Sequence, residues 1–240
     1  MQPDKVIVFD IWGRYAHFKK IYVTTSALSY AVPFKTSVYG LVGAILGLEK
    51  KGNEYLESFN NENCKVAIQV VNPIKIQRLN INLSVEPGLI KGNRKPTMLE
   101  YVTDPYYRIY FWHSDQNLMD DLLQHLKNKT SVYTPVLGLS HCLANFKLLG
   151  IFDLKLLEST DVIHSVIPKS QIVDIDSQYW EENEIHIQEQ DMYPLEMNTK
   201  REVTKRDSIL FDINGKPVKA TVTNGYQVSM NNKPSNIILM

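Results

Sequence analysis

The sequence has few cysteines, no long apolar run and no net charge, and each absence excludes a class of protein. Its 240 residues include two cysteines, Cys64 and Cys142, which form neither a disulfide framework nor a paired metal motif, so we expect two reduced thiols. No apolar run approaches the ~20 residues that a membrane-spanning helix needs. Residues 1–5 are polar, and the apolar stretch after them is too short for a secretory signal. We therefore expect a cytoplasmic protein with no membrane partner.

Catalytic and cofactor signatures are also missing. The chain contains no P-loop, no dinucleotide-binding glycine motif, no His-Glu-x-x-His and no cysteine pairs for zinc. Its histidines are scattered at spacings that place no two of them on one helix face: His17, His113, His125, His141, His164 and His186. We therefore predict no catalytic residue, no metal and no cofactor.

The formal net charge is zero, but the charges are segregated along the chain. Residues 74–96 contain five Lys or Arg and one Glu, a net charge of +4, whereas residues 174–196 contain eight acidic residues and no Lys or Arg, a net charge of −8. The positive charge of the first segment favours binding of phosphate groups. The negative charge of the second favours binding of a basic partner or repels nucleic acid. For each segment, an ordinary solvated loop is the alternative.

The most informative run begins at Tyr30 and reads YAVPFKTSVYGLVGAILGL. Pro33 fixes an extended approach, Thr36 and Ser37 are good helix caps, and Lys35 lies beside them. The pattern predicts a helix over 36–48 whose first amides, hydroxyls and lysine bind phosphate. Glycine and alanine recur on one face of this helix, so another chain can approach it closely. A buried helix packed on a sheet is the alternative.

Hydrophobic periodicity predicts an α+β fold in the order β–α–β–hairpin–β–α–β. Ser114 or Asp115 is expected to cap the second of the two helices. This is the ferredoxin-like (RRM-like) split βαβ plan, with a β-hairpin thumb inserted at about 74–104. We expect this domain over residues 1–157 and a small β-rich C-terminal subdomain over 158–240. The strands are predicted at 6–11, 65–71, 74–84, 106–112, 146–157, 162–167, 208–213, 219–223 and 236–239.

Basic and aromatic residues are interleaved in the loop after the first strand, over 12–28. Arg14, His17, Lys19 and Lys20 stand among tyrosines and a phenylalanine, a mixture that can hold phosphates and stack on unpaired bases. The alternative is that these aromatic rings pack back on the domain. In the predicted thumb, further basic residues can contact a nucleic-acid backbone without reading its sequence: Arg78, Lys91, Arg94 and Lys95.

Several motifs together resemble the Cas five family of the CRISPR-associated RAMP superfamily, in its type I-B-like form. They are the run from Tyr30, EYVTDPYYRIYF from Glu100 and YTPVLGLSH from Tyr133. The resemblance covers residues 1–157, and only REVTKRDSILFD looks similar in the last third. It implies a subunit that caps the 5′ handle of the guide RNA (crRNA) in a type I Cascade complex. Such a subunit contacts the backbone and large subunits and meets target DNA only through the assembled complex.

The resemblance also implies where RNA lies. Gly138, Ser140 and His141 belong to a loop that the family places near the handle. From the residues themselves, we expect RNA against the turn at 30–40, the loop after the first strand and the base of the thumb. The strand at 106–111 does not match the RNP1 pattern, so we do not expect bases to stack across the sheet. The remaining expected RNA contacts are Tyr30, Tyr39, Gly40 and Arg108.

A metal-independent endoribonuclease is the alternative function, because some members of the resembled family cut precursor guide RNA. That chemistry needs a general base, a general acid and a cation near the phosphate. The nearest residues of these types are His113, Tyr107 and Lys19, and no compact motif unites them. We therefore predict a non-catalytic RNA-binding subunit, and a protein–protein scaffold is a third interpretation.

Overall fold

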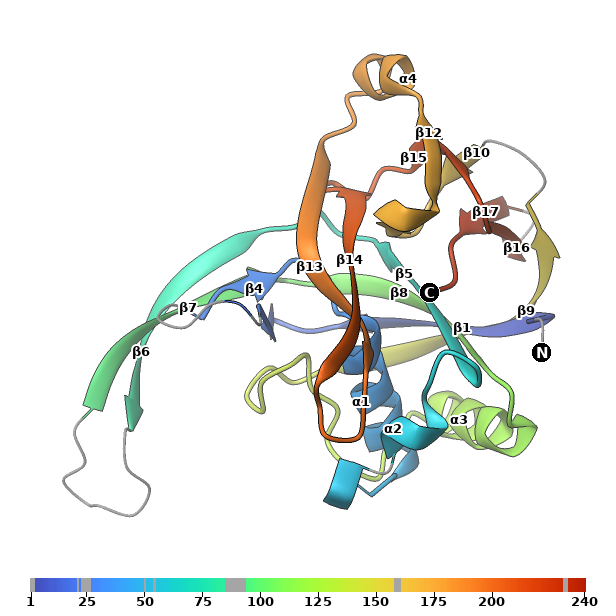
Figure 1. Ribbon diagram of the computed structural model, residues 1–240. Helices are drawn as coiled ribbons and strands as arrows, with labels where there is room; N and C mark the ends of the chain where they lie inside the picture. The colour runs from blue at the N-terminus through green and yellow to red at the C-terminus, as the bar shows by residue number, and fades with distance from the viewer. Residues whose placement is uncertain are drawn as a thin grey trace.

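The computed structural model describes residues 3–20, 22, 27–49, 51–53, 55–84, 94–157, 161–230 and 233–240. At its centre, β1 (Lys5–Trp12) lies antiparallel between β8 (Tyr106–His113) and β9 (Asn145–Leu156), and β5 (Cys64–Val70) pairs with the other side of β8. Alternate residues of β1 point to opposite faces. Ile7, Phe9 and Ile11 pack with the helices, whereas Val6 and Val8 pack with the C-terminal strands, so the sheet has an apolar core on both faces (Figure 1).

Helices α1 (Lys35–Leu46), α2 (Tyr55–Ser58) and α3 (Gln116–Asn128) cover one face of the sheet, with the 3-10 turn Lys51–Asn53 between the first two (Figure 1). α3 begins as predicted, since the Asp115 carboxylate accepts from the backbone N–H of Asn117 at 2.9 Å. α1 does not: its N-cap is Phe34, and no side chain caps it. The prediction that Thr36 and Ser37 cap this helix is therefore wrong, because both lie inside its first turn. In the described part of the chain, no helix is long and apolar enough to cross a membrane.

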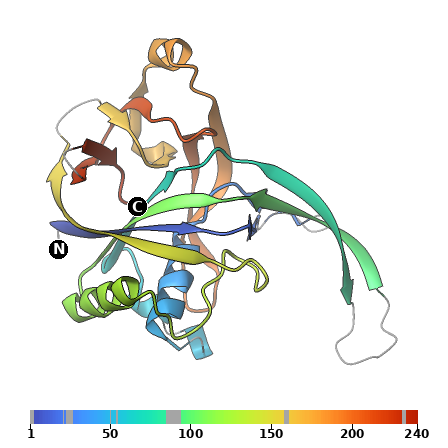
Figure 2. The ribbon, with the colours of Figure 1, turned by 180° about the vertical axis from the view of Figure 1, so that it is seen from behind.

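Strands β6 (Ile76–Ser84) and β7 (Arg94–Thr103) form a long antiparallel arm, which realises the predicted hairpin. The arm extends away from the body (Figures 1 and 2). At its base, β7 pairs with β2 (Tyr15–Ala16), and the short β3 (Phe18–Lys19) pairs with β4 (Ser29–Tyr30). Because Leu99, Tyr101 and Val102 are buried, the base of the arm belongs to the core.

The residues after β9 extend the same sheet. β16 (Tyr226–Met230) pairs with β9, and the order continues through β17 (Lys233–Ile237), β10 (Asp161–Ile163), β15 (Val218–Val222) and β12 (Ile172–Ile175). Segments of this part also return to β5: Met240 and Val66 exchange two backbone hydrogen bonds, and the Val166 N–H donates to the Ile68 carbonyl at 2.7 Å. Strands on both sides of residue 157 thus share one sheet, and the domain boundary proposed there stays a prediction.

A second sheet lies over the start of α1 and consists of β11 (Ile167–Pro168), β14 (Val203–Asp212) and β13 (Ile187–Met197). The 3-10 turn Lys169–Gln171 and the short helix α4 (Ser177–Glu182) flank β12. The Tyr193 hydroxyl donates to the Pro33 carbonyl at 2.6 Å, and the Tyr30 hydroxyl donates to the Met192 carbonyl at 2.7 Å. The sequence did not indicate β13, because its run is acidic and contains Pro194. An edge strand tolerates that proline.

Within the fold, lysines from other elements pair with much of the acidic segment 174–196. The closest pairs are Asp176 with Lys219 at 2.8 Å and Glu189 with Lys169 at 2.7 Å; Glu184 with Lys216 and Glu196 with Lys205 lie at 3.8 and 3.9 Å. Such exposed pairs contribute at most about 1 kcal/mol each. They nevertheless place a lysine of this chain near four of the eight acidic residues of the segment.

Candidate functional site

Tyr101, near the base of the arm, is surrounded by rings from two other segments. Tyr15 packs against it with 5.5 Å between ring centroids, and the His17 ring lies at 5.9 Å. The Tyr101 hydroxyl is hydrogen-bonded to Nε2 of His141 at 2.9 Å. Tyr101 and His17 are buried and His141 is exposed, so this cluster presents one imidazole to solvent.

His17 ties the arm to the loop after β1. Its Nδ1–H donates to the Glu100 carbonyl at 2.7 Å, and its backbone N–H donates to the Leu137 carbonyl at 3.0 Å. Burial lowers the pKa of the imidazole. A buried neutral histidine with these partners positions its neighbours and does not present a cation to a ligand.

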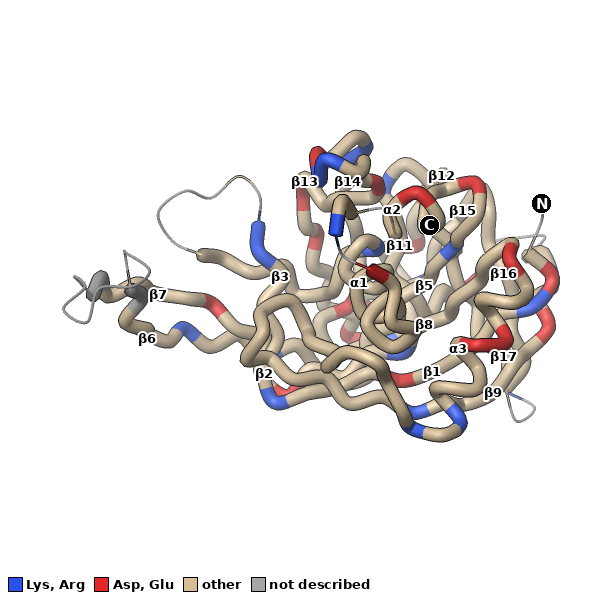
Figure 3. The backbone as a smooth tube through the Cα atoms, turned by 90° about the horizontal axis from the view of Figure 1, so that it is seen from below, with Lys and Arg blue, Asp and Glu red and all other residues tan. Residues whose placement is uncertain are grey.

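The Glu100 carboxylate joins β4 to an exposed cation of the arm. It accepts from the Ser29 backbone N–H at 3.1 Å and lies 3.4 Å from Nε of Arg78. Because the Arg78 side chain is 62% exposed, its guanidinium remains open to solvent. Lys19, opposite Ser29 in the β3–β4 pair, is also exposed. Figure 3 shows basic residues at β2, β3 and β6 around the base of the arm.

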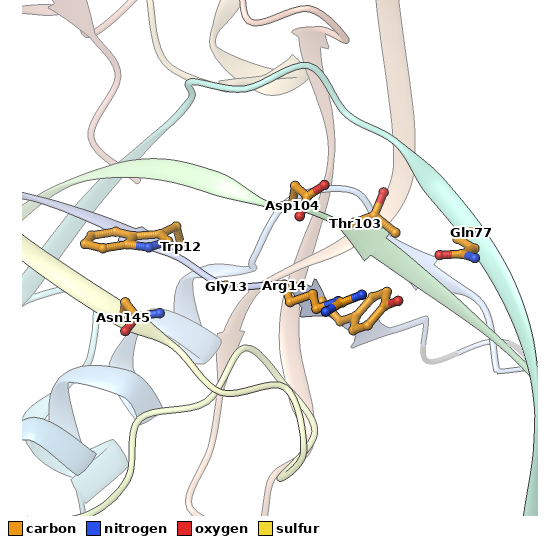
Figure 4. A pocket seen from close by; sticks show the side chains of 8 residues that line it. Trp12, Gly13, Arg14, Gln77, Thr103, Asp104 and Asn145 are labelled. Atoms are coloured by element: carbon orange, nitrogen blue, oxygen red, sulfur yellow. The ribbon is translucent and has the colours of Figure 1, made fainter.

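A cavity of about 590 Å³ opens beside this cluster (Figure 4). The Arg14 guanidinium, which is exposed, lies 5.8 Å from the centroid of the Tyr15 ring. The Trp12 indole stacks on Tyr106 with 5.5 Å between centroids and 11° between planes. The cavity is lined by Trp12, Gly13, Arg14, Tyr15, Gln77, Thr103, Asp104 and Asn145.

Arg108 supports the wall of this cavity through Asp10. Its Nε and Nη2 donate to the two Asp10 oxygens at 2.8 and 3.2 Å, and the Tyr106 hydroxyl donates to the same carboxylate at 3.1 Å. The hydrogen bond to Asp10 raises the pKa of Arg108. The pair fixes Tyr106 and, through the stack, Trp12. Arg108 is therefore engaged with the protein in this structure.

The predicted loop with Gly138, Ser140 and His141 does lie at the base of the arm. Ser140 and His141 are exposed. Gly138 has a φ of +95°, and a Cβ at this position would lie 1.9 Å from the His17 carbonyl oxygen. The close backbone approach that explains this glycine is thus an approach to the loop after β1, within the protein itself.

Most of the predicted RNA contacts around the start of α1 are covered by the protein, although Tyr30 and Lys20 directly follow Ser29 and Lys19 of the site in the sequence. Tyr30, Lys35, Thr36 and Tyr39 are all buried. Among the other three, Ser37 is half-buried, Gly40 is exposed, and the Lys20 ammonium lies 5.6 Å from the centroid of the Tyr30 ring. The four buried side chains have packing roles here, and the phosphate site proposed for this turn stays a prediction.

Lys35 is only 1% exposed. Its ammonium donates to Oδ1 of Asn61 and lies 5.8 Å from the centroid of the Tyr39 ring. Burial, with a smaller contribution from Lys65, lowers its pKa to about 8. The Thr36 hydroxyl is buried and has no hydrogen-bond partner among the described residues. The positive charge of Lys35 is therefore held inside the protein.

The residues considered for RNA cleavage are bound to separate parts of the backbone. The Tyr107 hydroxyl is buried and donates to the Ala31 carbonyl at 2.5 Å. His113 accepts from the Asp115 N–H through Nδ1 and donates through Nε2 to the Ser58 carbonyl, both at 3.0 Å. Lys19 lies at the base of the arm, and among the described residues no hydrogen bond or ion pair joins it to His113 or Tyr107.

Sequence reasoning missed the residues that organise the site, namely Trp12, Glu100, Tyr101, Asp104 and Asn145. EYVTDPYYRIYF contains three of them, but their importance depends on the pairing of β2 with β7, which no local pattern reveals. Of the predicted arm cations, Arg94 and Lys95 belong to the distal end of β7, and Lys91 lies outside the described residues.

Comparison with known proteins agrees with this architecture. A crystal structure of a CRISPR protein from Archaeoglobus fulgidus is 11% identical with a TM-score of 0.55, and the match covers 97% of this chain and 98% of that chain. A chain of a CRISPR RNA-guided surveillance complex is 11% identical with a TM-score of 0.53, over 90% and 91% of the two chains. No curated protein matches. The family model described as CRISPR-associated protein (Cas_Cas5) matches residues 6–209. The chain therefore belongs to the Cas5 family of CRISPR-associated proteins.

Proposed function

We propose that this protein is a non-catalytic RNA-binding subunit of a type I Cascade complex, of the I-B-like form, which caps the 5′ handle of the crRNA. The observation that carries the proposal is the convergence of Arg14, Lys19, Arg78 and His141 at the base of the arm. Exposed cations hold phosphates and exposed rings stack on unpaired bases. Membership of the Cas5 family supports an RNA partner.

The arrangement of the strands supports the remaining parts of the proposal. The chain order β1, α1, β5, β8, α3, β9, with the sheet order β9-β1-β8-β5, is that of a ferredoxin-like unit, and the arm is its insertion. We propose that the arm reaches the backbone subunit and the body contacts the large subunit. Target DNA then meets this protein only through the assembled complex, in the cytoplasm.

The RNA-binding part is tested by reversing two exposed cations. Arg14→Glu with Arg78→Glu should weaken binding of a crRNA that carries its handle by tenfold or more, and should reduce the salt dependence of binding by roughly two phosphate contacts. Lys155→Glu with Lys233→Glu makes the same charge change at exposed positions of β9 and β17 and should have a much smaller effect. Equal losses in both pairs, measured by fluorescence anisotropy, would mean that the base of the arm is not the RNA site.

The proposal includes no RNA cleavage, and the separation of His113, Tyr107 and Lys19 supports this. The purified protein should leave its cognate repeat RNA intact during incubation in EDTA, and His113→Ala should leave guide-RNA maturation unchanged. Specific cleavage by the purified protein would instead establish the endoribonuclease alternative.

A further inference from the structure

The cavity at the base of the arm combines an aromatic wall with polar groups of both kinds, donors and acceptors (Figure 4). Its volume of about 590 Å³ lies within the range of small-ligand sites in proteins. The wall is preorganised, since Trp12 is stacked on Tyr106 and the Tyr106 hydroxyl is held by the Asp10–Arg108 pair. A flat ring can therefore stack on this wall without a rearrangement of the side chains that form it.

Most polar side chains of the cavity lack a hydrogen-bond partner among the described residues; Thr103, which donates to the Lys75 carbonyl at 3.3 Å, is the exception. Glu100, His17, His141 and Arg108 all have hydrogen-bond partners. Within the described residues, the side chains of Asp104, Gln77 and Asn145 make no hydrogen bond; all three are exposed to solvent. The Arg14 guanidinium lies over the ring of Tyr15, and it forms no ion pair with the described residues. A ligand that enters the cavity thus meets a carboxylate, two amides and a guanidinium, and none of these side chains must first break a bond within the protein.

The backbone sets Asp104 and Arg14 opposite each other at the edge of the cavity. The Asp104 N–H donates to the Arg14 carbonyl at 2.9 Å, and Tyr15 pairs with Thr103 in the adjoining β2–β7 ladder. Asp104 has a φ of +47°, a left-handed conformation that aspartate and asparagine adopt more readily than most residues. The turn between β7 and β8 therefore places a residue with an acceptor group, Asp104, opposite a residue with a cationic donor, Arg14, and both line the cavity.

We propose that this cavity binds one unpaired guanine base of the RNA strand at the base of the arm, an inference that rests on the proposed RNA-binding function. A carboxylate accepts from the two adjacent donors of guanine, N1–H and the 2-amino group. A guanidinium donates to its O6 and N7. Adenine, cytosine and uracil each lack part of this pattern. Trp12 supplies the apolar surface on which the ring lies.

The test uses the full chain and labelled RNA octamers of uridine that carry one central G, A, C or inosine. The G octamer should bind roughly ten- to a hundredfold more tightly than the all-uridine octamer, as expected for one bidentate base contact. Inosine, which lacks the 2-amino group, should lose a large part of this preference. Salt-dependent binding of all octamers with equal affinity would overturn the guanine site and leave the proposed function standing. No binding of any octamer would overturn both.

The variant Asp104→Asn keeps a residue that tolerates the left-handed turn, so the fold is retained. It should remove most of the preference for G over U, because an amide offers one acceptor and one donor in place of two acceptors. Asp153→Asn makes the same charge change on the exposed part of β9 and should leave the preference intact. An unchanged preference for G in Asp104→Asn would show that the base is read elsewhere.

Discussion

The base of the arm and the start of α1 both combine basic and aromatic side chains, but the fold uses them in opposite ways. At the arm base, Arg14, Lys19 and Arg78 are exposed, and within the described residues only Arg78 is paired with a carboxylate. At the start of α1, Lys35 is buried with its ammonium on Asn61 and near the Tyr39 ring. The base of the arm exposes its positive charges to a ligand, whereas the start of α1 holds its lysine inside the protein.

The difference comes from what packs on top of each region. β13 covers the start of α1, where Gln190 accepts from the Ala31 N–H at 3.1 Å and Tyr193 donates to the Pro33 carbonyl. The arm instead projects away from the body, so its base stays open on the side of the cavity (Figures 2 and 4). A local pattern of cations and rings is a binding site only where long-range packing leaves it uncovered.

The largest expected effect is a charge reversal made in each region. Lys35→Glu places a carboxylate in a buried site beside the Asn61 oxygen. Burying an unpaired charge costs about 3–5 kcal/mol, so the variant should melt about 6–20 °C below wild type or fail to fold. Lys19→Glu makes the same change at the surface and should shift the melting temperature by less than about 2 °C while weakening RNA binding. A Lys35→Glu variant that melts like wild type would mean that Lys35 lies at the surface, where it could bind phosphate.

The next effect concerns Gly138, whose loop closes the base of the arm. Gly138→Ala introduces a Cβ that would overlap the His17 carbonyl at a φ of +95°, so the loop must shift. We expect a loss of about 2–3 kcal/mol in the free energy of unfolding, measured by urea titration, together with weaker RNA binding because His141 moves with the loop. Wild-type stability in this variant would contradict the close packing of the loop on His17.

The sequence predicted the elements that depend on local patterns and missed those that depend on distant pairing. α3 follows from Asp115 and its apolar stripe, and the arm follows from alternation. β13 was not predicted, because its acidic residues and Pro194 are typical of a loop, and only its pairing with β14 makes it a strand. For the site, Arg14, Arg78 and His141 were each predicted, but their convergence on β7 needs the β2–β7 and β6–β7 ladders. The covering of the turn before α1 likewise depends on β13, whose Gln190 lies 159 positions after Ala31.

A smaller effect, of opposite sign, is expected from Lys35→Met. A pKa lowered from 10.5 to about 8 corresponds to about 3 kcal/mol by which burial disfavours the charged form. Methionine removes this penalty but also the bond to Asn61, so the variant should melt a few degrees above wild type at pH 7. A melting temperature below that of wild type would mean that the contacts with Asn61 and Tyr39 outweigh the burial penalty.

The pH dependence of that difference has a definite sign. Between about pH 8 and 10.5 the unfolded chain keeps the Lys35 proton that the folded protein has lost, so wild-type stability rises with pH there relative to the variant. The advantage of Lys35→Met should therefore shrink towards pH 10. The neighbouring Cys64 does not interfere, because burial raises its pKa to about 12. A difference that stays constant from pH 7 to 10 would contradict a buried, titrating Lys35.

The smallest expected effect tests the exposed part of α1. Gly40 lies inside the helix, and a Cβ there would meet nothing within 4 Å. Alanine is favoured over glycine in helix interiors by up to about 1 kcal/mol, so Gly40→Ala should raise the melting temperature by about 2–4 °C. RNA affinity of the isolated protein should not change, in contrast to Gly138→Ala. If Gly40→Ala weakened RNA binding while raising the melting temperature, RNA would lie against this face of α1. The base of the arm and the start of α1 would then both contact RNA.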